Sequence, residues 1–378
     1  MIRTMEPVMK HGRNTWDRAT LPPDEFEERR LVVERAAESM GAVAVVGFAD
    51  SSHPGLVGYL SNYLTAGALA TLICVPGVEP TLLAGLGGGR DHPFIKGMSL
   101  VQDVRWFPQL GAGIASVLAE HGIAGGRIAV AGLDECFNRA RADAVLVALA
   151  GYEVVTFDET LDGLRRCKRE REMSVMRAGR TILGEAEAAL LASLQSAGGV
   201  HGALVVAERV AKLRGCRDFR ALALAQDGSL RPWPEGGAGP TSWSSDPFAV
   251  YLAAEYLGYW ADLAVSGPDH AASPSLCVQA LGVVQDSLRA GSSGASLQVA
   301  LEDRLGPTAD HVTLEATGIG LTLAEAPLLS DDVSARAREG DVVCIRVWVR
   351  DGQAVTAATR QVLVETQRCT PLEDTLPM

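Results

Sequence analysis

The sequence predicts a two-domain protein, with an α/β domain over residues 1–160 and an α+β domain over residues 161–378. Three observations favour this fold class. Apolar runs of strand length alternate with helical patterns over residues 23–157, which is typical of a mainly parallel sheet covered by helices. After residue 215 most apolar runs have strand length, which is typical of an antiparallel sheet with helices on one side. The chain has 378 residues, enough for two domains of ordinary size.

In the first domain, the earliest helical pattern carries Phe26, Val33 and Met40 at helical intervals and stops at Gly41. The predicted helices cover residues 23–40, 114–121 and 138–150. Short apolar runs bounded by glycine, proline or polar residues predict buried strands. These strands cover residues 42–48, 69–76, 80–84, 127–131 and 153–157.

In the second domain, the charged segment 158–171 is predicted to carry the domain junction, and glycines follow the two helical patterns after it. The predicted helices cover residues 168–194, 201–213, 273–290 and 295–304. The predicted strands cover residues 221–225, 248–253, 256–263, 342–349 and 361–364. Residues 227–246 are rich in glycine and proline, so we expect a loop there.

Charge and cysteine usage limit the possible partners and compartments. The formal net charge is −12 and no large basic patch is present, so the sequence does not favour nucleic-acid binding. The seven cysteines are odd in number and lack Cys-x-x-Cys spacing, which indicates free thiols in a reducing compartment. No signal peptide and no apolar run near the ~20 residues that span a bilayer are visible. We expect a cytoplasmic protein with no membrane partner.

One stretch carries a family resemblance. Residues 316–327 read Ala-Thr-Gly-Ile-Gly-Leu-Thr-Leu-Ala-Glu-Ala-Pro. This is similar to Gly-His-Gly-Ile-Gly-Leu-x-x-His-Glu-x-Pro of the creatinase/prolidase/aminopeptidase P family (peptidase M24), with Thr317 and Ala324 replacing its two histidines. Three further segments resemble family motifs in the family's order. They are Gly-Tyr-Leu-Ser-Asn-Tyr at 58–63, Leu-Arg-Arg-Cys-Lys at 164–168 and Ala-Glu-Tyr-Leu-Gly-Tyr-Trp-Ala-Asp at 254–262.

The resemblance covers about residues 25–370. It implies a creatinase-like α/β domain, followed by an α+β "pita-bread" domain, in a homodimer. In metal-dependent members of the family, two aspartates, a histidine and two glutamates hold two divalent ions. The resemblance places these five positions at Tyr251, Asp262, Thr317, Arg346 and Thr359. Of the five positions, only Asp262 still has a side chain of the type that binds these ions. The fixed positive charge of Arg346 repels cations. We therefore expect a divergent member with no metal and no other cofactor.

Three charged residues are the candidate catalytic groups. Asp262 and Arg346 are expected in one pocket, where Arg346 holds a substrate carboxylate and Asp262 orients an amine or acts as a base. The alternative is that the two form a buried ion pair and nothing more. Glu325 is a candidate general acid–base, or else a capping or sheet-surface carboxylate. Cys344 lies two residues before Arg346 on the same predicted strand, so it shares that face and can line the pocket.

Five further residues are candidate substrate-binding groups. Tyr251 and Trp233 can stack on a flat substrate, or can fill the space that the metal ions have left. In metal-independent creatinase and ectoine hydrolase, the resemblance places a histidine near the position of Trp233. Thr317 and Thr359 can donate hydrogen bonds. His92, in an N-terminal loop, can supply a base to the partner's site in a homodimer, or can be a surface histidine.

The leading functional hypothesis is a metal-independent enzyme of the creatinase/prolidase fold. Its substrate is expected to be a small polar, carboxylate-bearing molecule, and its reaction C–N bond hydrolysis or a related biosynthetic step. The alternative is a catalytically inactive pseudoenzyme that serves as a binding or dimerisation module. An accessible pocket with a perturbed titratable group favours the enzyme. A pocket plugged by its own side chains favours the pseudoenzyme.

Overall fold

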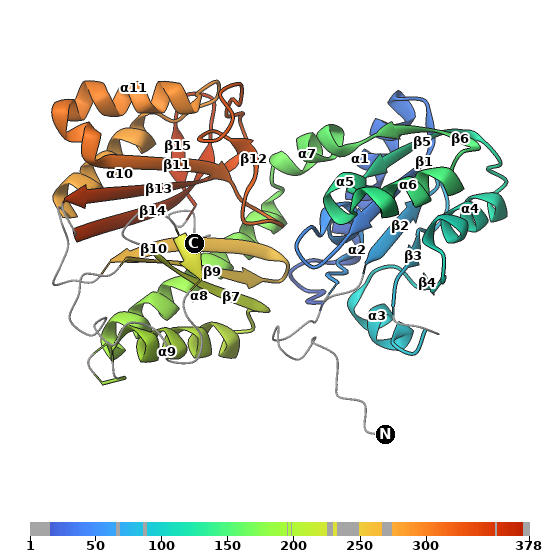
Figure 1. The fold of residues 1–378 in the computed structure, drawn as a ribbon, viewed down its shortest axis with the longest axis horizontal. Helices are drawn as coiled ribbons and strands as arrows, with labels where there is room; N and C mark the ends of the chain where they lie inside the picture. Colours follow the sequence, from blue (N-terminus) through green and yellow to red (C-terminus); the bar gives the residue numbers. More distant parts are fainter. Residues whose placement is uncertain are drawn as a thin grey trace. The chain divides into compact units, whose positions relative to one another are not determined.

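The structure is a computed structural model, and it divides into two compact units, Met1–Arg165 and Arg166–Met378 (Figure 1). The boundary lies near the end of helix α7 (Asp158–Arg166), within the charged segment where the sequence places the domain junction. The structure describes residues 16–65, 69–85, 89–194, 196–197, 199–224, 230–232, 249–266, 274–351 and 354–372.

The first unit is built on a six-stranded sheet of order β4-β3-β2-β1-β5-β6. The strands are β1 (Ala42–Ala49), β2 (Ala70–Cys74), β3 (Thr81–Leu83), β4 (Asp103–Arg105), β5 (Gly126–Ala131) and β6 (Tyr152–Thr156). β1 and β5, β5 and β6, and β3 and β4 pair in parallel, whereas β2 is antiparallel to both neighbours. The sheet is thus mainly parallel, as predicted, and β2 is its one reversed strand, which a short turn at Gly77 joins to β3 as a hairpin.

The helices of this unit are α1 (Pro23–Ser39), α2 (Gly55–Ser61), α3 (His92–Met98), α4 (Leu110–Glu120), α5 (Leu133–Cys136), α6 (Arg139–Ala148) and α7. Sequence periodicity predicts α1, α4 and α6 and misses the shorter helices. α2 is buried along its whole length, so it has no polar face and no amphipathic pattern. Apolar residues of β1 and β5, such as Val46 and Ile128, form the core with Ile114 of α4.

The second unit contains two antiparallel sheets, of order β10-β9-β7-β8 and β12-β11-β13-β14-β15. The first sheet comprises β7 (Asp218–Leu224), β8 (Leu230–Pro232), β9 (Ala249–Tyr256) and β10 (Tyr259–Ser266). The second comprises β11 (Val312–Gly318), β12 (Glu325–Leu328), β13 (Val342–Asp351), β14 (Ala354–Val364) and β15 (Cys369–Pro371). The sheets meet where the backbone N–H of Ala264 on β10 donates to Thr359 Oγ1 on β14, at 2.9 Å.

Helices cover one face of each sheet in the second unit. α8 (Glu170–Ser193) and α9 (Val200–Leu213) pack on the first sheet, and α10 (Pro274–Ser287) and α11 (Gly294–Leu305) pack on the second. Leu263 of β10 and Ile345 of β13 belong to these helix-covered cores. Because strand side chains alternate, Asp262 and Arg346 point to the opposite face of their sheets. That face, which we call the open face, carries the candidate site.

All seven cysteines are free in the structure. Among the described residues, none of the helices combines the length and the apolar character needed to cross a bilayer.

Candidate functional site

A closed hydrogen-bond network surrounds the Asp262 carboxylate. Its Oδ2 accepts from the Tyr251 hydroxyl at 2.7 Å and from Arg346 Nε at 2.7 Å, and Arg346 Nη2 binds the same oxygen. The Cys344 thiol donates to Oδ1. Asp262 and Cys344 are fully buried, so the carboxylate has its partners inside the protein and no contact with water. The predicted Asp262–Arg346 pair and the predicted placement of Cys344 on its face are both present.

Strand register explains why these residues meet. In the β9–β10 hairpin, Tyr251 lies opposite Ala264, so it shares a face with Asp262, two residues earlier on β10. On β13, Arg346 lies opposite Thr359 of β14. On β11, Thr317 lies opposite Cys344. The five positions that the resemblance identifies with metal ligands therefore come together on the open face of the two sheets.

The network has a buried layer and a partly accessible layer. Tyr251, Thr317 and Arg346 keep 6–7% of their surface exposed above the fully buried Asp262. Arg346 Nη1 donates to Thr317 Oγ1 at 3.2 Å, and the guanidinium carbon lies 5.5 Å from the centre of the Tyr251 ring. Arg346, Thr317 and Tyr251 therefore lie nearer to solvent than Asp262, which has no exposed surface.

Burial fixes the protonation of the neutral members. Burial, and then the negative charge of Asp262, raise the pKa of Tyr251 well above its usual value of 10.0. The same two causes raise the pKa of the Cys344 thiol well above its usual 9.0. Both groups therefore stay protonated near neutral pH and serve as donors to Asp262. Neither is available as a nucleophile, because the thiolate and the phenolate are disfavoured.

The residues present do not fit two divalent ions. Divalent ions of this kind need carboxylate and imidazole ligands. Here Tyr251, Thr317 and Thr359 offer only neutral hydroxyl groups, and the guanidinium of Arg346 binds the one remaining carboxylate, Asp262. No metal-dependent step follows from such a donor set.

Sequence reasoning did not identify Glu315, which also lies on the open face. It is opposite Arg346 in the β11–β13 register, and its Oε2 lies 3.9 Å from Arg346 Nη1. Its side chain is 41% exposed, so a ligand can reach it. Burial of the remainder raises the pKa of Glu315 above its usual 4.5, although the positive charge of Arg346 opposes that effect. The sequence could have indicated this position of Glu315, because it lies two residues before Thr317 and strand residues with this spacing share one face.

Glu325 belongs to a different cluster. Its carboxylate binds the ammonium group of Lys168, and the exposed fractions of the two side chains are only 8% and 2%. Glu325 also accepts from the Thr322 hydroxyl at 3.4 Å. Its predicted role as a general acid–base stays a prediction. The ion pair with Lys168 gives Glu325 a structural role. The pair links β12 to Lys168, which lies two residues before α8.

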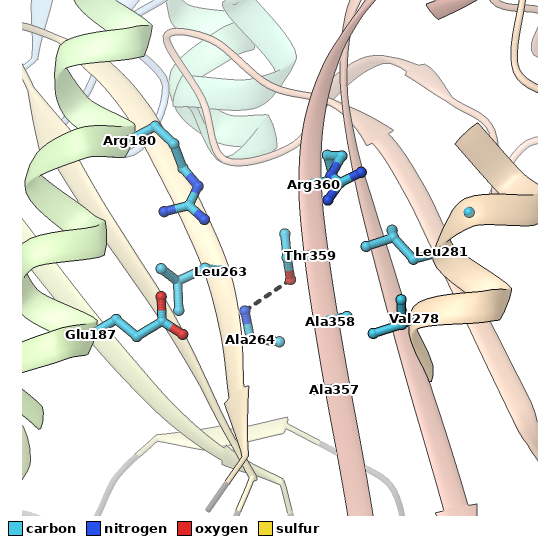
Figure 2. Close-up of a pocket in the computed structure, with 11 residues that line it drawn as sticks. Arg180, Glu187, Leu263, Ala264, Val278, Leu281, Ala357, Ala358, Thr359 and Arg360 are labelled. Carbon is cyan, nitrogen blue, oxygen red and sulfur yellow. Dashed lines mark hydrogen bonds between the residues drawn. The ribbon is translucent and has the colours of Figure 1, made fainter. Parts of the chain in front are cut away.

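A cavity of about 390 Å³ opens at the seam between the sheets (Figure 2). Figure 2 shows Arg180 and Glu187 of α8 on one side, and Arg360 with Val278 and Leu281 of α10 on the other. Thr359 lines this cavity, and its hydroxyl accepts from the Ala264 backbone. Its observed role is thus to join the sheets. Its predicted role in substrate binding stays a prediction.

Gln361 is a second residue that sequence reasoning missed. It is fully buried and lies opposite Cys344 in the β13–β14 register. Among the described residues, neither its side-chain oxygen nor its nitrogen has a hydrogen-bond partner. It lies two residues after Thr359 on the same strand, and this spacing could have indicated that both side chains share one face.

The remaining predicted site residues are Trp233 and His92. Trp233 falls outside the described residues. His92 belongs to the first unit, where it begins α3 and its ring packs against Gly89. Its predicted contribution to the site of a partner subunit stays a prediction, as does the homodimer itself.

No model of a known protein family matches the sequence, and no curated protein matches it either. Solved structures do match. An X-Pro aminopeptidase from Thermotoga maritima is 15% identical, with a TM-score of 0.73 over 92% of this chain and 98% of that chain. A prolidase from Pyrococcus horikoshii is 16% identical, with a TM-score of 0.70 over 92% and 99%. A structure described as a putative aminopeptidase P from Bacillus anthracis is 11% identical, with a TM-score of 0.67 over 94% and 96%.

Proposed function

We propose that this chain, which has the two-domain fold of the creatinase/prolidase/aminopeptidase P proteins, is a metal-independent, hydrolase-like enzyme. Its substrate is a small polar molecule that carries a carboxylate, and its reaction is the hydrolysis of a C–N bond. Similar solved structures belong to aminopeptidases and prolidases, and the peptide bond is itself a C–N bond. These structural matches confirm the fold that the sequence resemblance implies.

One observation carries the proposal: an accessible carboxylate with a raised pKa lies beside a fixed guanidinium. Glu315 and Arg346 provide this pair on the open face, with 3.9 Å between their nearest atoms. A raised carboxylate pKa suits a group that moves protons near neutral pH. This is the feature expected of an enzyme and not required of a pseudoenzyme.

Each group then has a role. Arg346 and Thr317 bind the substrate carboxylate, with Tyr251 beside them. Glu315 takes a proton from the water that attacks the carbon of the C–N bond, and it returns that proton to the leaving nitrogen. A C–O bond forms and the C–N bond breaks. Asp262 is a positioning residue, because its Oδ2 accepts from both Nε and Nη2 of Arg346 and so holds the guanidinium in place.

A second candidate is a binding or dimerisation module without catalysis. One observation favours it: the predicted base, Asp262, is already occupied by Tyr251, Arg346 and Cys344. In this case the network has replaced the metal ions as a structural support. The two candidates differ in what Glu315 does.

We expect Glu315→Gln to lower kcat by about 10²–10⁴-fold, because this change removes the proton acceptor. In the wild type the rate should fall as pH drops through the pKa of Glu315, which lies above its usual 4.5, because protonation removes the base. The assay incubates the chain in EDTA with N-acyl, N-amidino and X-Pro compounds that carry a carboxylate. Mass spectrometry detects the released amine.

The control is Glu302→Gln, an exposed glutamate on α11, which should keep full activity. Thermal melts establish that both variants fold. Hydrolysis by the wild type that needs added manganese or cobalt would contradict metal independence. Binding of a substrate without any turnover would favour the non-catalytic candidate.

A further inference from the structure

A second cluster of ligand-bearing side chains lies in the first unit. Asp50 and His53 follow the carboxyl end of β1, and Cys136 ends α5, which follows the carboxyl end of β5. β1 and β5 are adjacent and parallel, so their carboxyl ends meet at one edge of the sheet. One ligand atom from each of the three residues lies within 4.8 Å of the others.

The chemical types of the three donor atoms indicate which ion the cluster can bind. They are a carboxylate oxygen, an imidazole nitrogen and a thiol sulfur. Zinc and similar borderline divalent ions accept this mixture, whereas magnesium and calcium prefer oxygen ligands alone. Three protein ligands also leave a fourth position for water or another ligand. His53 and Asp50 have 42% and 31% of their side chains exposed, so an ion can enter from solution.

Hydrogen bonds already orient two of the donors. Asp50 Oδ1 lies 3.1 Å from His53 Nδ1 and accepts from the backbone N–H groups of Ser52 and His53, each at 2.7 Å. These three bonds use Oδ1 only, so Oδ2 is the carboxylate oxygen left for an ion. Nδ1 is the ring nitrogen that faces the Asp50 carboxylate, so Nδ1 and not Nε2 is the nitrogen that can share an ion with Asp50.

Helix α5, which carries Cys136, is held against β1 by the contacts of Gly132 and Phe137, the residues on either side of it. Gly132 has φ +77°, and a Cβ there would lie 2.6 Å from the carbonyl oxygen of Phe48. Its backbone N–H donates to Asp158 Oδ1 at 2.7 Å. Phe137, next to Cys136, packs edge-on against Phe48 with 5.1 Å between ring centres. The thiol is therefore placed by rigid elements, as a metal site requires.

The surroundings favour a cation. The negative charges of Asp50, Glu135 and Asp158 all act on the Cys136 thiol. Such a field attracts a divalent ion, and a bound ion offsets the negative charge.

We propose that Asp50, His53 and Cys136 bind one zinc-like divalent ion. On binding, the Cys136 thiol releases its proton to solvent, and the thiolate sulfur, an imidazole nitrogen and a carboxylate oxygen coordinate the ion. This site is independent of the proposed hydrolytic function, because all three ligands belong to the first unit.

The test uses cobalt as a spectroscopic probe. The full chain is stripped with EDTA, desalted and titrated with Co²⁺. We expect one equivalent to produce the near-ultraviolet band of thiolate-to-cobalt charge transfer. Cys136→Ser should abolish the band and weaken binding at least about tenfold. Cys167→Ser, which changes an exposed cysteine, should alter neither.

His53→Gln guards against a folding defect in the cysteine variant, because this partly exposed side chain can change with little effect on the core. It should weaken cobalt binding by at least about tenfold while the thiol remains. A wild type without the band would overturn the proposal. So would a band that persists in Cys136→Ser, or full affinity in a folded His53→Gln protein.

Discussion

Arg346→Ala should lower the free energy of unfolding by about 3–5 kcal/mol, because it leaves the Asp262 carboxylate buried without a counter-charge. Asp262 is fully buried, so water cannot compensate for the loss. Two neutral donors, Tyr251 and Cys344, remain on the carboxylate, but neither carries a charge. Urea unfolding followed by circular dichroism measures the change.

Two companion variants isolate the cause. Arg346→Ala combined with Asp262→Asn should recover much of the loss, because a neutral amide needs no counter-charge. Arg338→Ala removes an exposed arginine of the same unit and should change stability by less than about 0.5 kcal/mol. If Arg346→Ala and Arg338→Ala had equal effects, the ion pair would have no structural role.

Lys168→Met should also cost about 3–5 kcal/mol of unfolding free energy, since it removes the cation from the buried Glu325. Methionine approximates the aliphatic part of lysine, so the change removes charge with little loss of packing. Differential scanning calorimetry and urea unfolding measure the effect.

Adding Glu325→Gln to Lys168→Met should restore part of the lost stability, because the buried charge is then gone. Lys96→Met, at an exposed position, is the matched control and should change little. A Lys168→Met protein as stable as the wild type would remove the structural role assigned to Glu325. Glu325 would then stay a candidate for general acid–base catalysis beside Glu315.

The sequence predicts the long elements of this fold well and the short or uniformly buried ones poorly. α8 and β13 are long and strongly patterned, and their predicted bounds are close to those observed. β11 was not predicted, because its residues were interpreted as a motif and not as a strand. Yet it places Glu315 and Thr317 on one face by alternation alone.

The site was predictable only as far as the resemblance reached. The family resemblance identified five positions, and the register of the strands brings all five together on the open face. It could not reveal Glu315 or Gln361, because neither occupies a ligand position in the family. It also could not show that Asp262 would be saturated by its neighbours, since the donors come from two strands, β9 and β13, whose spacing depends on the folded sheets.

Metal content tests the central claim, metal independence at the open face, most directly. The double variant His53→Gln/Cys136→Ser, which lacks the proposed first-unit site, is dialysed against manganese, cobalt and zinc and desalted, and its metal is determined by elemental analysis. The donor set around Arg346 predicts far less than one ion per chain, with hydrolysis unchanged. About two ions per chain, lost on Asp262→Asn, would show instead that the open face is a working dinuclear site.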